Sequence, residues 1–161
     1  VREYPGEEGA LELAVSYTRL FLGPPAMLAP PYASYYLDRN AGVMGPSSVE
    51  MVKLYREAGL RIDEEFNEMP DHITVALEFL YFLLFRKGSP AGENVPFKEF
   101  DADSTMRRFL KNYFFTWIPE FCGRITAAGE HPFYTALANC LDTFAKRGFD
   151  REKAEGDENL R

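Results

Sequence analysis

The chain has little cysteine and little histidine. Cys122 and Cys140 are the only cysteines among 161 residues. They are too few for a disulfide framework, and their spacing matches neither paired zinc ligands nor a Cys-x-x-Cys redox site. Because both fall on apolar helical faces, we expect buried free thiols in a reducing compartment. His72 and His131 have no partner at metal-ligand spacing, so the sequence predicts no metal and no cofactor.

Motifs for nucleotide binding and for nucleophilic catalysis are also absent. Neither the Walker pattern nor the dinucleotide fingerprint occurs. An enzyme would have to rely on the neighbours Asp71 and His72, because a carboxylate can orient an imidazole for acid–base work. Three alternatives stay open: a binding protein that is not an enzyme, a small helical enzyme using this pair, and a structural subunit with a permanent partner. The absence of nucleophile and cofactor motifs favours the first.

Positive charge and long apolar runs are scarce. The 25 acidic and 18 basic side chains give a formal charge of -7, so nucleic acid would be repelled and a basic peptide fits better. The apolar run Ile73 to Phe85 contains Thr74 and Glu78, and it is shorter than the roughly 18 residues of a membrane span. The start, Val1 to Gly9, lacks the pattern of a secretion signal. We therefore expect a soluble, cytoplasmic protein that does not insert into membranes.

Aromatic side chains, in contrast, are abundant. The chain has 14 phenylalanines and 9 tyrosines. Helices rich in rings tend to leave ring-lined grooves at their junctions, which favours a binding protein. Apolar residues recur at three- and four-residue steps without strand-like alternation. The predicted fold class is all-α: one helical domain over residues 1–148, followed by a charged tail, 149–161, that we expect to fray.

Recognisable residues mark the ends of the predicted helices. Ser47 to Glu50 has the spacing of a capping box, and Asp71 and Asp103 are the expected N-caps of later helices. Gly59 and Gly148 are expected to end theirs. The predicted helices span residues 7–22, 47–58, 71–87, 103–117, 120–128 and 132–148.

The helix predicted over 71–87 is apolar nearly all round, which is typical of a central helix surrounded by other elements. An acidic turn precedes it, in which Pro70 would fix the angle of approach. The proline-rich connector 23–45 is expected to be an ordered surface, pinned by its side chains. The breaker-rich stretch 88–96 is the expected flexible excursion.

Two interpretations of the aromatic residues remain open. Trp117 stands at helical spacing with Phe109 and Phe114, which favours the core over a ligand pocket. For the tyrosines of segment 32–36, core and binding roles are about equally supported, because a proline-held loop cannot bury three rings on one face. Ordered loops are also where binding residues concentrate.

Several short motifs follow one another in a specific order. They are YTRLFLGP at 17–24, APPYASYYLD at 29–38, YREAGL at 55–60, EMPDHI at 68–73, FL at 109–110, WIPEF at 117–121 and PFY at 132–134. In this order and spacing they resemble the TorD/DmsD family, over most of the chain up to about Phe144.

The resemblance implies a cytoplasmic, all-helical maturation chaperone for redox enzymes. Such chaperones bind the twin-arginine signal peptide of a molybdenum oxidoreductase precursor and hold it back from export until its molybdopterin cofactor is loaded. Relatives usually begin with further helical residues ahead of Val1, so we expect either a truncated N-terminus or a short variant. A monomer and a domain-exchanged dimer both remain open.

The resemblance also implies a peptide-recognition site formed by two motifs. The acidic turn contributes Glu68, Pro70, Asp71 and His72. The Pro-Pro-aromatic motif contributes Tyr32, Ser34, Tyr36, Leu37 and Asp38.

The chain departs from the family pattern at three places. Tyr32 stands where some relatives have tryptophan, which would alter the peptide preference. Met69 stands where proline is frequent, which would loosen the turn. A histidine that many relatives carry near Tyr113 is absent.

The chemistry of the residues suggests which of them would contact each part of the peptide. A twin-arginine peptide offers two guanidinium groups followed by an apolar stretch. Our hypothesis is that carboxylates meet the arginines and rings take the apolar stretch. The carboxylates are those of Glu68, Asp71 and Asp38, and the rings are those of Tyr32, Tyr36 and Trp117.

Overall fold

A computed structural model describes residues 7–23, 26–38, 44–63, 67–88 and 100–158, with the backbone alone for residues 7, 149 and 151–158. Over these ranges the regular elements are all helices, which confirms the predicted fold class, and the one β-type pairing is an isolated bridge. The α-helices are α1 (Glu7–Tyr17), α2 (Ala33–Leu37), α3 (Pro46–Glu57), α4 (Ile73–Gly88), α5 (Ala102–Phe109), α6 (Ile118–Ala128) and α7 (Pro132–Glu158). Two π-helical segments, η1 (Thr18–Leu22) and η2 (Leu110–Phe114), continue α1 and α5.

The chain divides into two compact units. Within the described ranges, unit 1 comprises the residues up to Pro31 together with Ile118–Arg147, and unit 2 comprises Tyr32–Trp117 together with the residues from Gly148 onward. Each unit is described separately below.

Unit 1 joins α1 and η1 to α6 and α7 through rings and backbone acceptors. The ring of Phe21 lies 6.2 Å from that of Phe121 and 5.7 Å from that of Tyr134. The Tyr134 hydroxyl donates to the Leu13 carbonyl at 3.1 Å, and the Ser16 hydroxyl donates to the Glu130 carbonyl at 3.3 Å. Side-chain contacts therefore hold together helices that are a hundred or more residues apart in the sequence.

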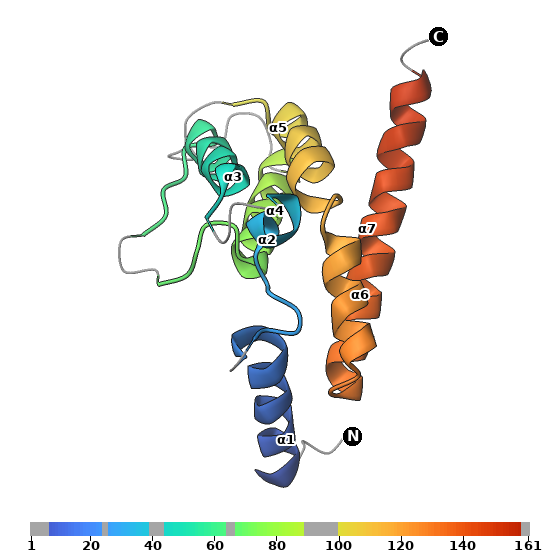
Figure 1. Ribbon diagram of the computed structural model, residues 1–161. Coiled ribbons are helices and arrows are strands. Elements are labelled where there is room, and N and C mark those ends of the chain that lie inside the picture. The colour runs from blue at the N-terminus through green and yellow to red at the C-terminus, as the bar shows by residue number, and fades with distance from the viewer. Residues whose placement is uncertain (1–6, 24–25, 39–43, 64–66, 89–99, 159–161) are drawn as a thin grey trace. The chain divides into compact units, whose positions relative to one another are not determined.

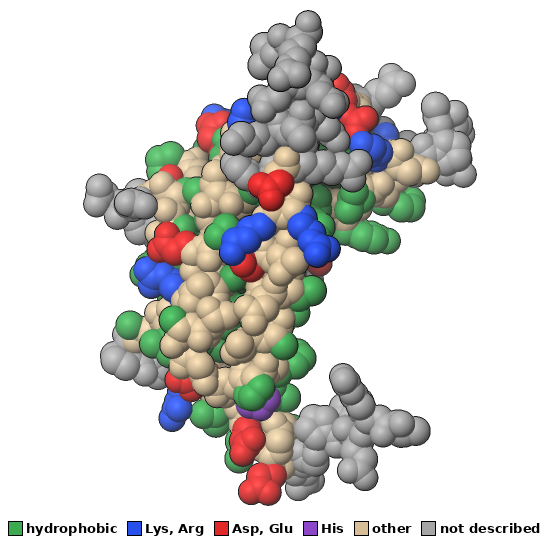
Figure 2. Space-filling view, turned by 90° about the vertical axis from the view of Figure 1, so that its right-hand side faces the viewer, with side chains coloured by type: hydrophobic (Ala, Val, Ile, Leu, Met, Phe, Trp, Pro, Cys, Tyr) green, Lys and Arg blue, Asp and Glu red, His purple; other side chains and the backbone are tan. Residues whose placement is uncertain are grey.

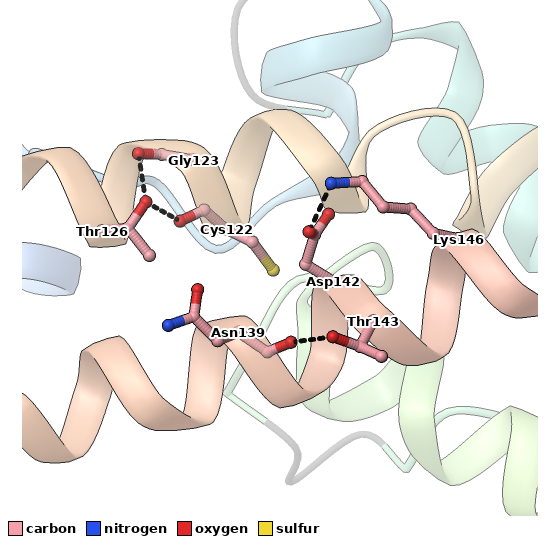
Figure 3. A network of polar contacts seen from close by, with 7 residues as sticks. All are labelled: Cys122, Gly123, Thr126, Asn139, Asp142, Thr143 and Lys146. Atoms are coloured by element: carbon pink, nitrogen blue, oxygen red, sulfur yellow. Dashed lines mark hydrogen bonds and ion pairs between the residues drawn. The ribbon is translucent and has the colours of Figure 1, made fainter.

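Helices α6 and α7 lie side by side, and Figure 3 shows the thiol of Cys122 turned from α6 toward α7. The Thr126 hydroxyl turns back onto its own helix and contacts the Cys122 carbonyl at 3.1 Å. On α7, Asp142 pairs with Lys146 at 2.6 Å. Cys122 is a buried free thiol, as expected, but Cys140 is exposed. The prediction for Cys140 was wrong because it lies two positions after buried Ala138, about 200° around the helix.

Unit 2 has a core of stacked and edge-on rings. Phe79 of α4 contacts Tyr55 of α3 at 4.7 Å and Phe109 of α5 at 5.1 Å between ring centroids. Helices α3, α4 and α5 accordingly lie together in Figure 1. Trp117 is fully buried, stacks on Tyr36 at 5.4 Å, and donates its indole N–H to the Tyr113 carbonyl at 2.8 Å. This confirms the core interpretation of Trp117.

Helix α4 is less enclosed than its composition predicts. One stripe, which includes Phe79 and Leu83, is buried, whereas Tyr81 is 72% exposed and Leu84 is 51% exposed. Exposed hydrophobic side chains are not confined to α4: on the face that Figure 2 shows, others lie at the surface between charged ones. The prediction of a helix surrounded by other elements was wrong for the described residues, because apolar composition alone does not specify how many neighbours a helix has.

Two helix starts differ from the predictions. Helix α3 begins at Pro46 after Gly45, with no side-chain cap, so Ser47 lies inside the first turn instead of capping it. The N-cap of α5 is Asp101, which accepts the Ser104 N–H at 3.0 Å. The expected cap, Asp103, pairs with Lys87 at 2.7 Å.

Helix ends were predicted with mixed success. Gly59, at φ 81°, ends α3, as predicted. The prediction for Gly148 was wrong, because α7 continues through it to Glu158; that the tail 149–161 frays stays a prediction. A glycine inside a helix costs only about 1 kcal/mol, and the residues that follow are good helix formers. The expected excursion 88–96 lies, after Gly88, outside the described residues.

Candidate functional site

The two motifs of the expected site lie against each other in unit 2. Tyr32 and His72 form an antiparallel bridge, and their rings are 5.3 Å apart in an edge-on arrangement. The Ala33 N–H donates to the Asp71 carbonyl at 3.0 Å. Residues about forty positions apart in the sequence therefore form one junction, in which the end of the connector is paired with the end of the acidic turn.

Asp71 fastens this junction from inside. Its side chain is fully buried, and its Oδ2 accepts the Ser34 N–H at 2.8 Å. Its Oδ1 has no hydrogen-bond partner among the described residues. The prediction that Asp71 caps α4 was therefore wrong, because its carboxyl group accepts the Ser34 N–H at the first turn of α2. In this conformation the carboxyl group does not reach the surface. Its hydrogen bond to Ser34 holds the two motifs together.

His72 caps α4 in place of Asp71. Its Nδ1 accepts the Thr74 N–H at 3.2 Å and lies 2.7 Å from the Thr74 hydroxyl. An accepting Nδ1 requires the neutral ring, and burial lowers the pKa of His72, although Glu68 and Asp71 oppose the shift. Because the Asp71 carboxyl group contacts Ser34 and the imidazole contacts Thr74, the geometry does not favour an acid–base pair.

Tyr55 of α3 supports the acidic turn through a hydrogen bond. Its hydroxyl donates to the Pro70 carbonyl at 2.9 Å, and its side chain is buried. Burial, and then the nearby Asp71, raise the pKa of Tyr55, so the phenol remains a donor. Tyr55 is not among the residues that the sequence predicts for the site. The available signal was its position at the start of the YREAGL motif.

Asp38 ties α2 to α3. Its Oδ2 accepts the Ser47 N–H at 3.0 Å and the Ser47 hydroxyl at 2.6 Å. Gly45 lies so close that an added Cβ would come within 2.3 Å of this oxygen, so only glycine fits there. Ser34 is buried, and its hydroxyl accepts the Met44 N–H at 3.2 Å. Asp38 and Ser34 therefore both act as internal fasteners in this conformation.

The expected site residues differ in their access to solvent. Tyr36, Ser34, Asp71, His72 and Trp117 are buried. Tyr32, Leu37, Asp38 and Pro70 are half-buried, and Glu68 is exposed. Glu68 is thus the carboxylate of the turn that a positively charged ligand can reach directly.

Beside the junction, α3 and α4 enclose a groove. A cavity of about 360 Å³ is lined by residues of α3, segment 60–63 and α4, among them Tyr55. The abundance of rings predicts ring-lined grooves in general, but the sequence does not indicate where this groove lies. Among the described residues there is no group of three or more His, Cys, Asp or Glu side chains able to hold a metal ion. None of the described helices has the length and apolar character needed to cross a membrane.

Curated relatives and a solved structure resemble the chain. It is 30% identical over 139 residues to the chaperone protein TorD of Vibrio parahaemolyticus, covering 86% of this chain and 63% of that protein. For TorD of Photobacterium profundum the identity is 32% over 140 residues, with coverages of 87% and 63%. For TorD of Escherichia coli it is 32% over 135 residues, with coverages of 84% and 61%. The chain thus spans less than two thirds of the length of these relatives.

The fold comparison agrees. A crystal structure of a proposed redox enzyme maturation protein from Archaeoglobus fulgidus superimposes with a TM-score of 0.54 at 26% sequence identity, covering 83% of this chain and 65% of that chain. The resemblance to TorD expected from the motifs is confirmed by these relatives. A family model described as nitrate reductase delta subunit matches residues 2–123. Since that match covers more than half of the sequence, this chain belongs to the nitrate reductase delta subunit family.

Proposed function

We propose that the protein is a cytoplasmic chaperone that binds the twin-arginine signal peptide of a molybdenum-containing oxidoreductase precursor and assists its assembly before export. It acts by binding and is not an enzyme. Family membership, and relatives named as TorD chaperones, support this function. The A. fulgidus structure supports the link to redox enzyme maturation.

The observation that carries the proposal is the junction between Tyr32 and His72. It joins the two motifs that resemble the chaperone family, and it leaves the carboxylate of Glu68 exposed beside them. A guanidinium group forms its strongest hydrogen bonds with a carboxylate. In our proposal Glu68 contacts an arginine of the peptide, while half-buried Tyr32 and Leu37 contact its apolar part.

The buried residues of the expected site have a different part in this proposal. Asp71 and Ser34 keep the turn and the connector together, and Trp117 supports Tyr36 from the core. The overall charge of -7 attracts a basic peptide over longer distances. Recognition therefore depends on a few surface groups held in position by an internal frame.

Calorimetric titration with a twin-arginine signal peptide and its Lys-Lys variant tests the proposal. The twin-arginine peptide should bind, and the Lys-Lys variant should bind more weakly, because lysine cannot form the paired hydrogen bonds of a guanidinium group. Glu68→Gln should weaken binding by about fivefold, which corresponds to about 1 kcal/mol. Glu12→Gln, an exposed position on α1, is the matched control and should bind like the wild type.

Two results would contradict the proposal. One is the failure of both peptides to bind at low salt, where electrostatic attraction is strongest. The other is equal binding by the wild type, Glu68→Gln and Glu12→Gln, which would remove the acidic turn from recognition.

A further inference from the structure

The groove beside the junction has an apolar, ring-rich lining. Helix α3 contributes Tyr55, and helix α4 contributes Val75, Phe79 and Phe82. The segment that follows α3 contributes Leu60 and Ile62. With a volume of about 360 Å³, the cavity falls within the range of ligand sites, about 300–1,000 Å³. It can take a few aliphatic side chains.

Backbone hydrogen bonds and ring contacts form the walls of this groove. At the end of α3, the Gly59 N–H donates to the Arg56 carbonyl and the Leu60 N–H donates to the Tyr55 carbonyl, at 3.0 and 2.8 Å. This is the Schellman arrangement, and the positive φ of Gly59 permits it. It turns the chain so that Leu60 and Ile62 form one wall. The opposite wall is held by Phe79, which packs against the rings of both Tyr55 and Phe109.

Charged residues are distributed unevenly along the groove. Asp63 and Glu78, both exposed, line the apolar cavity together with Arg61. An adjoining cavity of about 790 Å³ shares Arg61 and adds Arg56. Among the described lining residues, carboxylates occur only at the apolar cavity, whereas the charged residues of the adjoining cavity are arginines. This arrangement complements an apolar segment that carries positive charge next to it.

Tyr55 connects the groove to the junction. Its ring lines the cavity, and its hydroxyl donates to the Pro70 carbonyl at 2.9 Å. The residue after Pro70 is Asp71, which holds Ser34. A group that fills the groove therefore contacts the same side chain that supports the acidic turn.

We propose that this groove between α3 and α4 binds the apolar residues that follow the arginine pair of the signal peptide, while the arginines lie at the acidic turn and at Glu78. The inference rests on the proposed function and extends the apolar part of the binding site from Tyr32 and Leu37 into this groove. Tyr55 is a positioning residue, because it connects the two parts. Apolar anchors presented by a peptide to a groove are a common mode of recognition.

Peptides that differ only in the apolar stretch provide the test without disturbing the protein. The full chain is titrated with a twin-arginine signal peptide and with a version in which the apolar residues are replaced by serine and glycine. The wild type should bind the first at least about tenfold more tightly, as expected for burial of one or two aliphatic side chains.

Two protein variants locate the apolar contact. Ile62→Gln changes the wall of the groove without adding charge, and Val49→Gln is the control, at an exposed position of α3 that lines neither cavity. Ile62→Gln should lose most of the discrimination between the two peptides, whereas Val49→Gln should keep it. Circular dichroism checks that both variants fold. A photo-reactive phenylalanine at the first apolar position of the peptide should cross-link to residues 60–63 or 75–82.

The outcomes separate this inference from the proposed function. If the signal peptide binds but both variants discriminate like the wild type, or the cross-links fall outside these segments, the groove is not the apolar subsite and the chaperone proposal stands. If neither peptide binds, both proposals are overturned.

Discussion

Replacing the Asp71 side chain tests the internal frame of the site. Asp71→Ala removes the acceptor of the Ser34 N–H and leaves that donor buried without a partner, because Ser34 is itself fully buried. A buried, unsatisfied donor costs about 1–3 kcal/mol. Asp71→Asn keeps an oxygen of the same shape to accept the Ser34 N–H, and its amide nitrogen occupies the site of Oδ1. Because Oδ1 has no partner among the described residues, one unsatisfied polar atom replaces another there. We expect a cost below about 1 kcal/mol for Asp71→Asn.

The difference between the two variants is measurable by thermal unfolding. A loss of about 2 kcal/mol lowers the midpoint by roughly 4–8 °C for a chain of this length. The single tryptophan, Trp117, lies in the core of unit 2 with the junction, so its fluorescence follows the unfolding of the relevant part. Equal midpoints for Asp71→Ala and Asp71→Asn would refute the reasoning, because they would show that the Ser34 N–H does not depend on this acceptor.

Three further predictions concern single residues. Burial lowers the pKa of His72 below its usual 6.5, so the contribution of the neutral ring to stability is complete above pH 6.5 and is lost as the pH falls through the pKa of the folded state. Between pH 7 and pH 5 the midpoint of thermal unfolding should therefore decrease more for the wild type than for His72→Asn, whose amide can still cap α4. With Ellman's reagent at pH 8, exposed Cys140 should react at once and Cys122 slowly, since burial raises the pKa of the Cys122 thiol to about 12; a fast phase that persists in Cys140→Ser would contradict this. Gly59→Ala should destabilise unit 2 by about 1–2 kcal/mol in the same fluorescence assay, because alanine disfavours a positive φ; an unchanged midpoint would argue against the Schellman turn.

Sequence periodicity was sufficient for the helices and for part of the core. Apolar residues at three- and four-residue steps indicated every long helix, and Gly59 marked the end of α3. The same steps did not identify the buried face of α1 or α7, where Leu11 and Leu137 are exposed. Trp117 was placed correctly because its three-residue step from Phe114 is typical of one helix face. These signals are local, so they can be read without knowledge of the tertiary structure.

Helix caps and partners of polar side chains could not be predicted in the same way. Asp71 has the residue type and the position of a cap, yet the Ser34 N–H, 37 residues earlier, competes successfully for its carboxyl group. Ser47 likewise bonds to Asp38 instead of capping α3. Such pairs depend on which donor the fold brings near. For the same reason, the family motifs indicated where the candidate site lies, but the structure was needed to separate its exposed groups from its internal ones.

The π-helical segment η2 shifts the helical register between α5 and the residues that follow it. Phe109 and Phe114 are both fully buried although they are five residues apart, a spacing that an ordinary α-helix would place about 140° apart. The Phe115 N–H donates to the Leu110 carbonyl, five residues back, at 2.8 Å. In terms of register, η2 therefore holds one inserted residue. A relative with an unbroken α-helix here aligns correctly only with a one-residue gap between 110 and 114, where the exposed Lys111 and Asn112 are the positions that can be deleted without moving either phenylalanine off the core face.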